Sequence, residues 1–350
     1  MTPLPPPAPP APPAPISAMP GMAGRTAAPR TMRAAVLDGY GRSDRFRLAT
    51  VPRPEPGGLQ VLVRVRAAGV NPIDWKTRRG WLRLIRPAHF PMILGYDAAG
   101  EVAEVGPEVT AFAVGDPVYG MLDNRHGGAY AEYALALEGS LAPLPPALSF
   151  EEAAALPLAG LTALQALRDR GELAGGERVL VHGAAGGVGH LAVQVAVALR
   201  AEVTAVASGK HRDFLFQLGA DRFFAREEDD FTLLDETFDV VFDAVGRSGF
   251  KSVAPLLAPD GGIYVTTAIG PAAFFWGVLT AAGGLTGYPK RARMVGVRPN
   301  GADVDALSRL AQAGRLRPAV EHVFPLEEVA RAHDASESGG TRGKIVLRVS

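Results

Sequence analysis

Residues 178–194 read R-V-L-V-H-G-A-A-G-G-V-G-H-L-A-V-Q, and this stretch decides the fold. Val179 to His182 have the composition of a buried strand, small residues follow as far as Gly189, and the apolar run Leu191 to Leu199 is typical of a helix. Strand, glycine turn and helix in this order open a dinucleotide-binding βαβ unit. Glycine lets the backbone approach a pyrophosphate, and the helix N-terminus presents free N–H groups to it.

The spacing of the turn is Ala184-x-Gly186-x-x-Gly189, so alanine stands where the first glycine of the usual fingerprint belongs. A second strand, Glu202 to Ala207, ends at Ser208, where the residue that reads the adenosine ribose is expected. A glycine turn in some other α/β protein is the open alternative. We predict that the turn binds the cofactor through Ala184, Ala185, Gly186, Gly187, Val188 and Gly189.

Strand and helix patterns alternate after residue 178, which predicts a doubly wound parallel sheet in an α/β fold. The six strand candidates are Val179–His182, Val203–Ala207, Arg222–Ala225, Val240–Ala244, Ile263–Ile269 and Met294–Val297.

Short apolar segments separated by Gly, Pro and Asp turns fill the chain between Met32 and Leu137. The segment 61–67 alternates apolar and basic side chains, as a half-buried strand does. Repeated short strands predict a small β-rich, barrel-like domain. Ser149, with Glu152 three residues later, predicts the start of a helix through a capping box. A last strand is expected at 344–349 and should return to the β-rich domain.

The composition excludes several classes of function. Lys+Arg and Asp+Glu number 36 each, so no net charge indicates a nucleic-acid or membrane-surface partner. The chain has no cysteine, which excludes disulfides, thiolate zinc sites and a cysteine nucleophile, and fits a reducing, cytoplasmic compartment. The uncharged run between Gly261 and Pro289 is interrupted by glycine and proline, and its dense apolar part is too short to span a membrane.

The first 30 residues contain 11 prolines, mostly interleaved with alanine. Such a segment has no apolar face to bury, so we predict a disordered tail over residues 1–30. A solvated extension, or a start of the natural chain at Met22 or Met32, is favoured over a partner-binding arm.

Five further motifs accompany the glycine turn: V-N-P-I-D-W at 70–75, I-L-G-Y-D-A-A-G-E-V at 93–102, V-G-D-P-V-Y-G at 114–120, G-G-A-Y-A-E-Y at 127–133 and E-E-A-A-A-L-P-L-A-G-L-T-A at 151–163. In this combination the chain resembles the medium-chain dehydrogenase/reductase superfamily, in its zinc-free, zeta-crystallin-like quinone oxidoreductase branch. The resemblance implies a GroES-like catalytic domain, residues 31–153 plus 298–350, and a Rossmann NADPH-binding domain, residues 154–297. It also implies a homodimer that associates near 260–297.

Zinc is not expected. Alcohol-dehydrogenase members of the superfamily carry Cys where this chain has V-N-P-I-D, and Gly-His-Glu where it has Gly95-Tyr96-Asp97. The histidines show no metal-ligand spacing; they are residues 89, 126, 182, 190, 211, 322 and 333. Without a Lewis acid, oxidation of simple alcohols is disfavoured, whereas a quinone or an α,β-unsaturated carbonyl accepts hydride more readily.

The cofactor predicted is NADPH. An NAD enzyme has Asp or Glu at the ribose position, whereas this chain has Ser208 followed by Lys210 and Arg212, which suit a 2′-phosphate. The alternative is that these two cations only lie at the start of a solvent-exposed helix and bind no phosphate. By resemblance, the nicotinamide half would meet Thr162, Asp243, Ala244, Val245, Gly246, Thr267, Ala268 and Ile269, together with Lys344, which is equally well explained as a strand-flanking lysine.

Asn71 is the first choice for orienting the acceptor, by the motif of the family, with Asp74, Tyr96 and Trp75 as further candidates. The first three have structural alternatives: Asn71 stabilising the turn before Pro72, Asp74 capping a helix, and Tyr96 packing in the core. The activity predicted is hydride transfer from NADPH to a quinone or an activated C=C bond. The alternatives are an NADPH-binding sensor or crystallin-like protein with little catalysis, and an alcohol dehydrogenase.

Overall fold

The computed structural model describes residues 30–228, 230–268, 270–281 and 289–350. The chain divides into two units, Met1–Arg30 and Thr31–Ser350, and the second unit holds every helix and strand described here. The predicted disorder of residues 1–30 concerns residues that, except for Arg30, lie outside the described part.

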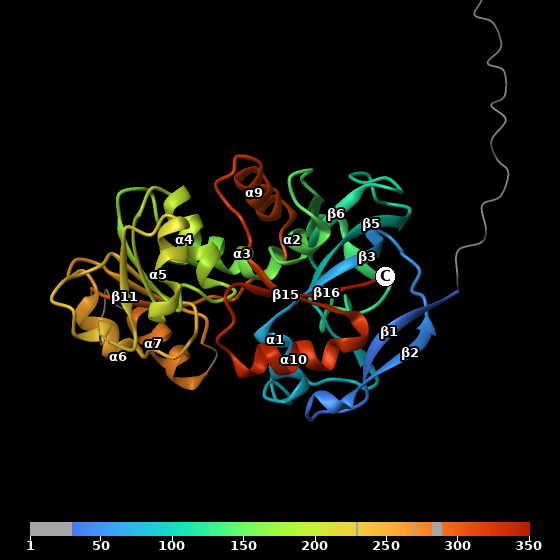
Figure 1. The fold of residues 1–350 in the computed structure, drawn as a ribbon, viewed down its shortest axis with the longest axis horizontal. Coiled ribbons are helices and arrows are strands. Elements are labelled where there is room, and N and C mark those ends of the chain that lie inside the picture. Colours follow the sequence, from blue (N-terminus) through green and yellow to red (C-terminus); the bar gives the residue numbers. More distant parts are fainter. Residues whose placement is uncertain (1–29, 229, 269, 282–288) are drawn as a thin grey trace, which may run out of the picture. The chain divides into compact units, whose positions relative to one another are not determined.

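Six parallel strands form one sheet in the order β11-β10-β9-β12-β13-β14 (Figure 1). In chain order this is 3-2-1-4-5-6, the order of a doubly wound dinucleotide-binding sheet, so the predicted fold class is confirmed. The direction of winding reverses between β9 and β12, which are neighbours in the sheet. The strands are β9 (Arg178–His182), β10 (Glu202–Ala207), β11 (Arg222–Ala225), β12 (Val240–Asp243), β13 (Ile263–Thr266) and β14 (Arg291–Met294).

The last strand was predicted at 294–297, and that prediction is wrong. β14 begins three residues earlier because its register is set by β13, with Ile263 opposite Arg291 and Thr266 opposite Met294. The prediction followed the apolar residues of 294–297, but β14 is paired on one side only and tolerates arginines. Arg291 and Arg293 both form ion pairs with Glu172.

Alternate residues of the sheet face two different cores. Val179 and Val181 pack into one core, whereas Leu180 between them packs into the other. The helices of this part are α3 (Pro157–Leu164), α4 (Gly189–Ala198), α5 (Arg212–Gln217), α6 (Phe250–Val253) and α7 (Pro271–Ala281).

The β-rich part contains a seven-stranded sheet, β15-β16-β3-β5-β6-β8 with β7 paired to β3, and a three-stranded sheet, β2-β1-β4. The C-terminal strand β16 pairs with β3 of the N-terminal part, as the sequence predicted (Figure 1). The strands are β1 (Thr31–Leu37), β2 (Phe46–Pro52), β3 (Gln60–Val70), β4 (Met92–Ile93), β5 (Asp97–Val105), β6 (Pro117–Met121), β7 (Tyr133–Leu137), β8 (Leu141–Pro143), β15 (Val320–Pro325) and β16 (Lys344–Arg348).

Four further helices are α1 (Pro72–Arg78), α2 (Phe150–Ala154), α9 (Gly301–Gln312) and α10 (Val329–Ser338). α1 and α10 pack on each other within the β-rich part, whereas α9 contacts both β8 and α3 and so links this part to the helices of the parallel sheet. Ser149 and Glu152 form the predicted capping box at the start of α2. The hydroxyl of Tyr119 on β6 lies 2.7 Å from Ser308 Oγ on α9. In addition, one continuous hydrophobic core includes residues of β6, α3 and the parallel sheet. The division into domains at residues 153 and 297 stays a prediction.

Within the described residues, no helix is long and apolar enough to cross a membrane.

Candidate functional site

The glycine turn between β9 and α4 has the compact backbone that the sequence predicts. Gly183 adopts a positive φ of 77°, and its N–H donates to the carbonyl of Val206 on β10. A Cβ atom on Gly189 would lie 2.1 Å from the Gly183 carbonyl oxygen, so a side chain cannot be accommodated there without a backbone shift. Gly186 and Gly187 have no atom closer than 3.3 Å to the position of a Cβ, which leaves their backbone accessible to a ligand.

The loop after β12 meets this turn where the sheet reverses its winding. The carboxylate of Asp243 accepts hydrogen bonds from the N–H groups of Val245, Gly246 and Ser248, at 3.1, 2.9 and 2.7 Å. Val245 packs so closely on Gly183 that a Cβ there would lie 2.1 Å from its methyl group. Ligands of open α/β sheets bind in this crevice, at the carboxyl ends of the strands.

The loop after β13 lies beside the same crevice. A Cβ on Gly246 would lie 3.0 Å from the backbone of Ala268, so the two loops are in contact. The N–H of Thr267 donates to the carbonyl of Asp243. The structure thus brings together Ala244, Val245, Gly246, Thr267 and Ala268, whereas Ile269 lies outside the described residues.

Thr162 is buried on α3, and its hydroxyl donates to the carbonyl of Leu158 in its own helix. Nothing in these contacts distinguishes a cofactor ligand from a structural threonine, and its role stays a prediction.

Ser208 follows β10 and lies next to a carboxylate, that of Glu227, which the sequence analysis did not identify. Glu227 accepts a hydrogen bond from the N–H of Gly209 at 3.1 Å and forms an ion pair with Arg226. A hydrogen bond from Ser208, together with that from Gly209, lowers the pKa of Glu227 to about 2. A carboxylate at this position is the feature by which an NAD site binds the ribose 2′-hydroxyl, so it opposes the NADPH prediction.

Cations surround the same position. Burial lowers the pKa of His211, and the charges of Lys210, Arg342 and Arg226 lower it further. Arg342 comes from the segment before β16, so this part of the basic cluster is visible only in the fold. Arg212, in contrast, lies over the ring of Phe223 at 5.0 Å. Lys210 and Arg212 are both exposed, and neither has an ion-pair partner among the described residues.

His190 in the first turn of α4 fixes the glycine turn to the C-terminal segment. Its Nδ1 lies 2.9 Å from the carbonyl oxygen of Gly186, and its Nε2 accepts the N–H of Ala319 at 3.1 Å. An acceptor at Nε2 requires the proton on Nδ1, so this ring is neutral. Burial lowers the pKa of His190 to about 4, which is consistent with that form.

Gly343 and Lys344 reach the glycine turn from β16. The N–H of Gly343 donates to the carbonyl of Ala185 at 2.9 Å, and the side chain of Lys344 passes beside Gly187. Lys344 is 3% exposed and lies at the junction between the turn and the β-rich part. This location agrees with the predicted site without establishing a contact with the cofactor.

The ammonium group of Lys344 ends in a buried polar network. It donates to the Oδ1 of Asn71 and lies 3.6 Å from the Oδ2 of Asp97. The Nδ2 of Asn71 donates to Asp97 Oδ2 at 2.9 Å, and the other oxygen of Asp97 accepts the N–H of Leu158 at 2.7 Å. Burial raises the pKa of Asp97 and lowers that of Lys344, and each charge opposes the shift of the other.

Both ends of the Asn71 amide are therefore occupied within the protein. Asn71 is 1% exposed, has extended backbone angles and precedes α1, as expected for a residue before proline. Its predicted role toward the acceptor, which stays untested, would act through Lys344 and Asp97 rather than by direct contact in this conformation.

Asp74 caps α1, which was the structural alternative, and is also part of the network. Its Oδ2 accepts the N–H of Asn71 at 2.8 Å and the hydroxyl of Tyr130 at 3.0 Å. Its Oδ1 is buried and has no hydrogen-bond partner among the described residues. Burial raises the pKa of Asp74 to about 7, so this carboxyl exchanges a proton near neutral pH.

Tyr96 is buried, and its hydroxyl donates to the carbonyl of Arg125 at 2.9 Å. The guanidinium of Arg86 lies 5.5 Å from its ring centre. Burial raises the pKa of Tyr96 to about 12, so the phenol keeps its proton at neutral pH and can act as a hydrogen-bond donor.

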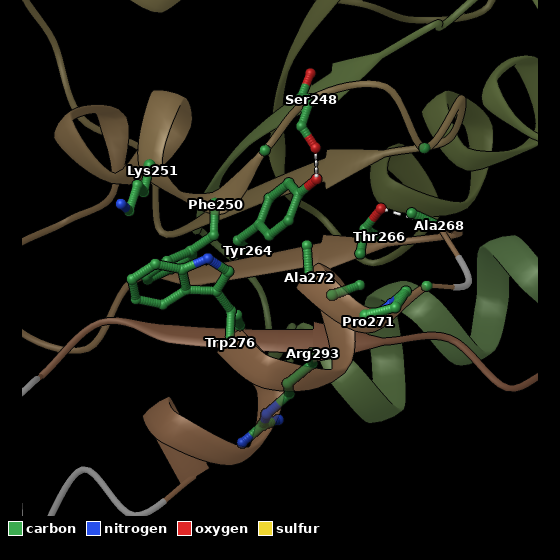
Figure 2. Close-up of a pocket in the computed structure, with 15 residues that line it drawn as sticks. Ser248, Phe250, Lys251, Tyr264, Thr266, Ala268, Pro271, Ala272, Trp276 and Arg293 are labelled. Carbon is green, nitrogen blue, oxygen red and sulfur yellow. Dashed lines mark hydrogen bonds between the residues drawn. The ribbon is translucent and has the colours of Figure 1, made fainter.

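A cavity of about 390 Å³ opens beside the loops after β12 and β13. Figure 2 shows Trp276, Phe250 and Tyr264 on its walls, with Lys251 at one side. The cavity shares Gly246 and Ala268 with the predicted nicotinamide site, but Asn71, Asp74 and Tyr96 do not line it. Of the aromatic run 274–276, Trp276 alone lines the cavity; the other two residues are exposed.

No group of three or more His, Cys, Asp or Glu residues that could hold a metal ion occurs in the described part of the chain. The His, Asp and Glu side chains of the described part therefore do not provide the set of protein ligands that a zinc site requires.

The sequence analysis placed Asp243 at the nicotinamide half of the site, whereas it missed Asp97, His190 and Glu227. Asp243 could be predicted because it ends a strand at the crevice, immediately before Ala244, Val245 and Gly246. The other three act through partners between 18 and about 250 positions away in the chain, which no local pattern predicts.

The comparisons with known proteins agree with this architecture. Residues 57–146 match the family described as alcohol dehydrogenase GroES-like domain, and residues 218–347 match the family described as zinc-binding dehydrogenase. A chloroplastic quinone-oxidoreductase homolog from Spinacia oleracea is 34% identical, over 91% of this chain and 99% of the relative. The chain belongs to the medium-chain dehydrogenase/reductase superfamily.

Two further relatives place the chain within this superfamily. The structure of the quinone oxidoreductase from Coxiella burnetii is 35% identical, with a TM-score of 0.82, and the match covers 91% of this chain and all of that one. The 2-methylene-furan-3-one reductase of Solanum lycopersicum is 33% identical over 91% of this chain and 79% of the relative. The resemblance to the quinone oxidoreductase branch is thus confirmed, and the chain is an oxidoreductase of a family that uses nicotinamide cofactors.

The neutral state of His190 predicts a pH dependence of stability. The unfolded chain takes up a proton near pH 6.5, whereas the folded chain does so only near pH 4. The contribution of His190 to the free energy of unfolding should therefore be fully present above about pH 6.5 and fall by up to about 3 kcal/mol as the pH decreases to about 4, while Asp74, with its raised pKa, acts in the opposite direction. Urea unfolding across this range measures the effect.

A His190→Gln variant should lose most of this pH-dependent part, whereas His322→Gln, at an exposed histidine, should keep it. If the free energy of unfolding depends on pH identically in the wild-type protein and the His190 variant, the neutral His190 ring does not contribute to that dependence.

Proposed function

We propose that this protein is a zinc-independent reductase that transfers hydride from NADPH to a quinone or an α,β-unsaturated carbonyl compound. The observation that carries the proposal is the convergence at one crevice of the glycine turn, the loops after β12 and β13, and Lys344. The names of the relatives, quinone oxidoreductase and 2-methylene-furan-3-one reductase, support both acceptor classes.

On the cofactor side, the chain would bind NADPH mainly through backbone groups. The N–H groups at the start of α4 and the accessible backbone of Gly186 and Gly187 suit a pyrophosphate. The loops after β12 and β13 would position the nicotinamide, because Asp243 holds the first of them in a fixed shape. NADPH, when bound, supplies the hydride, and the protein contributes its orientation.

On the acceptor side, Asn71 and Lys344 would act as positioning residues. Their network fixes the start of α1 relative to the glycine turn, so that acceptor and cofactor meet in one geometry. Tyr96 retains its proton at neutral pH, but its hydroxyl donates to the carbonyl of Arg125, so it would donate to the acceptor oxygen only by exchanging that partner. Water would supply the final proton.

The first test is oxidation of NADPH by a panel of quinones and enones, compared with simple aldehydes, with and without a metal chelator. We expect turnover of quinones or enones that is unaffected by the chelator. Asn71→Ala should lower kcat/KM about 100-fold, because small displacements of reacting groups have effects of this size. The matched control is Asn124→Ala, whose amide bonds the carbonyl of Leu135 in the β-rich part.

Two outcomes of this test would favour the alternatives. Tight NADPH binding without turnover of any acceptor supports a sensor or crystallin-like binding protein. Chelator-sensitive oxidation of simple alcohols supports an alcohol dehydrogenase.

The preference for NADPH needs its own test, since Lys210 and Glu227 predict opposite cofactors. If the basic cluster binds a 2′-phosphate, Lys210→Ala should lower kcat/KM for NADPH about tenfold, the loss of one charge-assisted contact, and leave NADH nearly unchanged. Glu227→Gln should then improve the use of NADPH.

A more efficient reaction with NADH, impaired by Glu227→Gln, would instead identify Glu227 as the ribose ligand and reject NADPH. Steady-state kinetics with both cofactors distinguishes these results.

We also propose a homodimer that associates near 260–297. It is supported by the edge of β14 that pairs with no other strand among the described residues, and by the exposed apolar side chains of Phe274, Phe275 and Val278 on neighbouring α7. Light scattering at micromolar concentration should give twice the mass of the chain, and a monomeric mass would refute the proposal.

The cytoplasmic location stays a prediction. Several relatives carry the words chloroplastic or mitochondrial in their names, which does not single out the cytoplasm.

A further inference from the structure

The turn between α1 and β4 exposes three large apolar side chains within five residues. Trp81 is 66% exposed, Leu84 92% and Ile85 69%. We call these three residues the apolar loop. Backbone hydrogen bonds give the segment a defined shape: Ile85 and Arg86 both donate to the carbonyl of Leu82. Adjacent exposed apolar side chains of this size indicate a surface that contacts another phase or molecule.

The charges around the apolar loop have one sign. The sequence from Trp75 to Tyr96 contains five Lys or Arg residues and no Asp or Glu. Arg83, between the apolar side chains, is exposed and has no ion-pair partner within the described part of the chain. Arg79 shares Glu337 with the buried Arg78, so the segment keeps an excess of positive charge. The whole chain has equal numbers of basic and acidic residues, so its net charge does not reveal this local excess of positive charge.

Trp, Leu and Ile side chains interspersed with arginine match the interface of an anionic bilayer. Aromatic and aliphatic side chains enter the headgroup region, while guanidinium groups bind the phosphates of acidic lipids. A protein partner would need a complementary apolar and acidic surface. The described part of this chain holds one surface of that kind, around the exposed Leu233 with Glu228, Asp230 and Asp235, so a second copy is the rival occupant that the test below separates from lipid.

We propose that the apolar loop docks this protein on membrane surfaces that contain anionic phospholipid. The loop inserts Trp81, Leu84 and Ile85 at the headgroup boundary, and Arg83 pairs with lipid phosphate. This association is peripheral, and it is independent of the proposed reductase activity.

The loop also lies next to the candidate acceptor site. The ring of Trp81 packs edge-on against Trp75 of α1 at 5.1 Å, and the guanidinium of Arg86 lies over Tyr96. A docked molecule would therefore present this side of the β-rich part to compounds dissolved in the bilayer.

Co-sedimentation of the full chain with vesicles tests the proposal without measuring activity. We expect binding to vesicles of phosphatidylglycerol and phosphatidylcholine in equal parts, and much weaker binding to pure phosphatidylcholine. Raising the salt from about 0.1 M to about 1 M shortens the screening length from about 10 Å to about 3 Å and should release most of the protein. Leu84→Ser/Ile85→Ser should lower the partition coefficient at least about tenfold.

Two control variants locate the contact. Leu233→Ser removes a leucine that is 80% exposed elsewhere and should bind vesicles like the wild type. Phe274→Ser/Phe275→Ser alters α7, where the proposed dimer contact lies, so its vesicle binding is compared with that of the wild type at the oligomeric mass that light scattering gives. If the loop variant does not fold, as judged by circular dichroism, Arg83→Glu replaces it and should weaken binding by reversing an exposed charge.

Absence of binding to anionic vesicles, or binding that the loop variants leave unchanged, would overturn the proposal. Loss of binding in the α7 variant alone would assign the contact to α7. A lower oligomeric mass of the loop variant in light scattering, without a change in vesicle binding, would identify the loop as a contact between copies.

Discussion

The site depends on a buried contact between the end of the chain and its N-terminal part. Lys344, on the last strand, places its ammonium group among Asn71, Val70 and Asp97, where almost no water reaches it. A buried cation without partners would be strongly unfavourable, so this lysine requires the carboxylate and the amide around it. The same segment binds the glycine turn through its backbone, and the two sides of the crevice are thereby fixed together.

A second set of polar contacts strengthens this junction from α4. His190 and Gln194 lie one turn apart and both bond the segment before β15: Gln194 exchanges two hydrogen bonds with the backbone of Arg317, and His190 bonds Ala319. Buried groups of this kind require directional partners, so they permit fewer arrangements than apolar packing does. The shape of the glycine turn is thus coupled to the β-rich part through side chains that do not belong to the phosphate motif.

The α/β class, the β-rich part and five of the six parallel strands could be predicted from the sequence, because periodicity and glycine spacing are local signals. The end of β14 could not, because pairing with β13 rather than apolar content sets its register. Asn71, Asp74 and Tyr96 were identified as a group, but their partners were not. Asp97 forms part of the network only because β5 pairs with β3, which brings it beside Gly69 and Asn71.

The sequence by itself determined the position and shape of the glycine turn, because that turn depends on consecutive residues and on the lack of a side chain at Gly189. It also determined the absence of cysteine ligands. Only the tertiary structure decided which charges surround the two halves of the site. Glu227 and Arg342 approach the end of β10 from different parts of the chain, and Lys344 meets Asp97 across 247 positions. Electrostatic interactions act through space, so chemistry that depends on them is fixed only when the chain has folded.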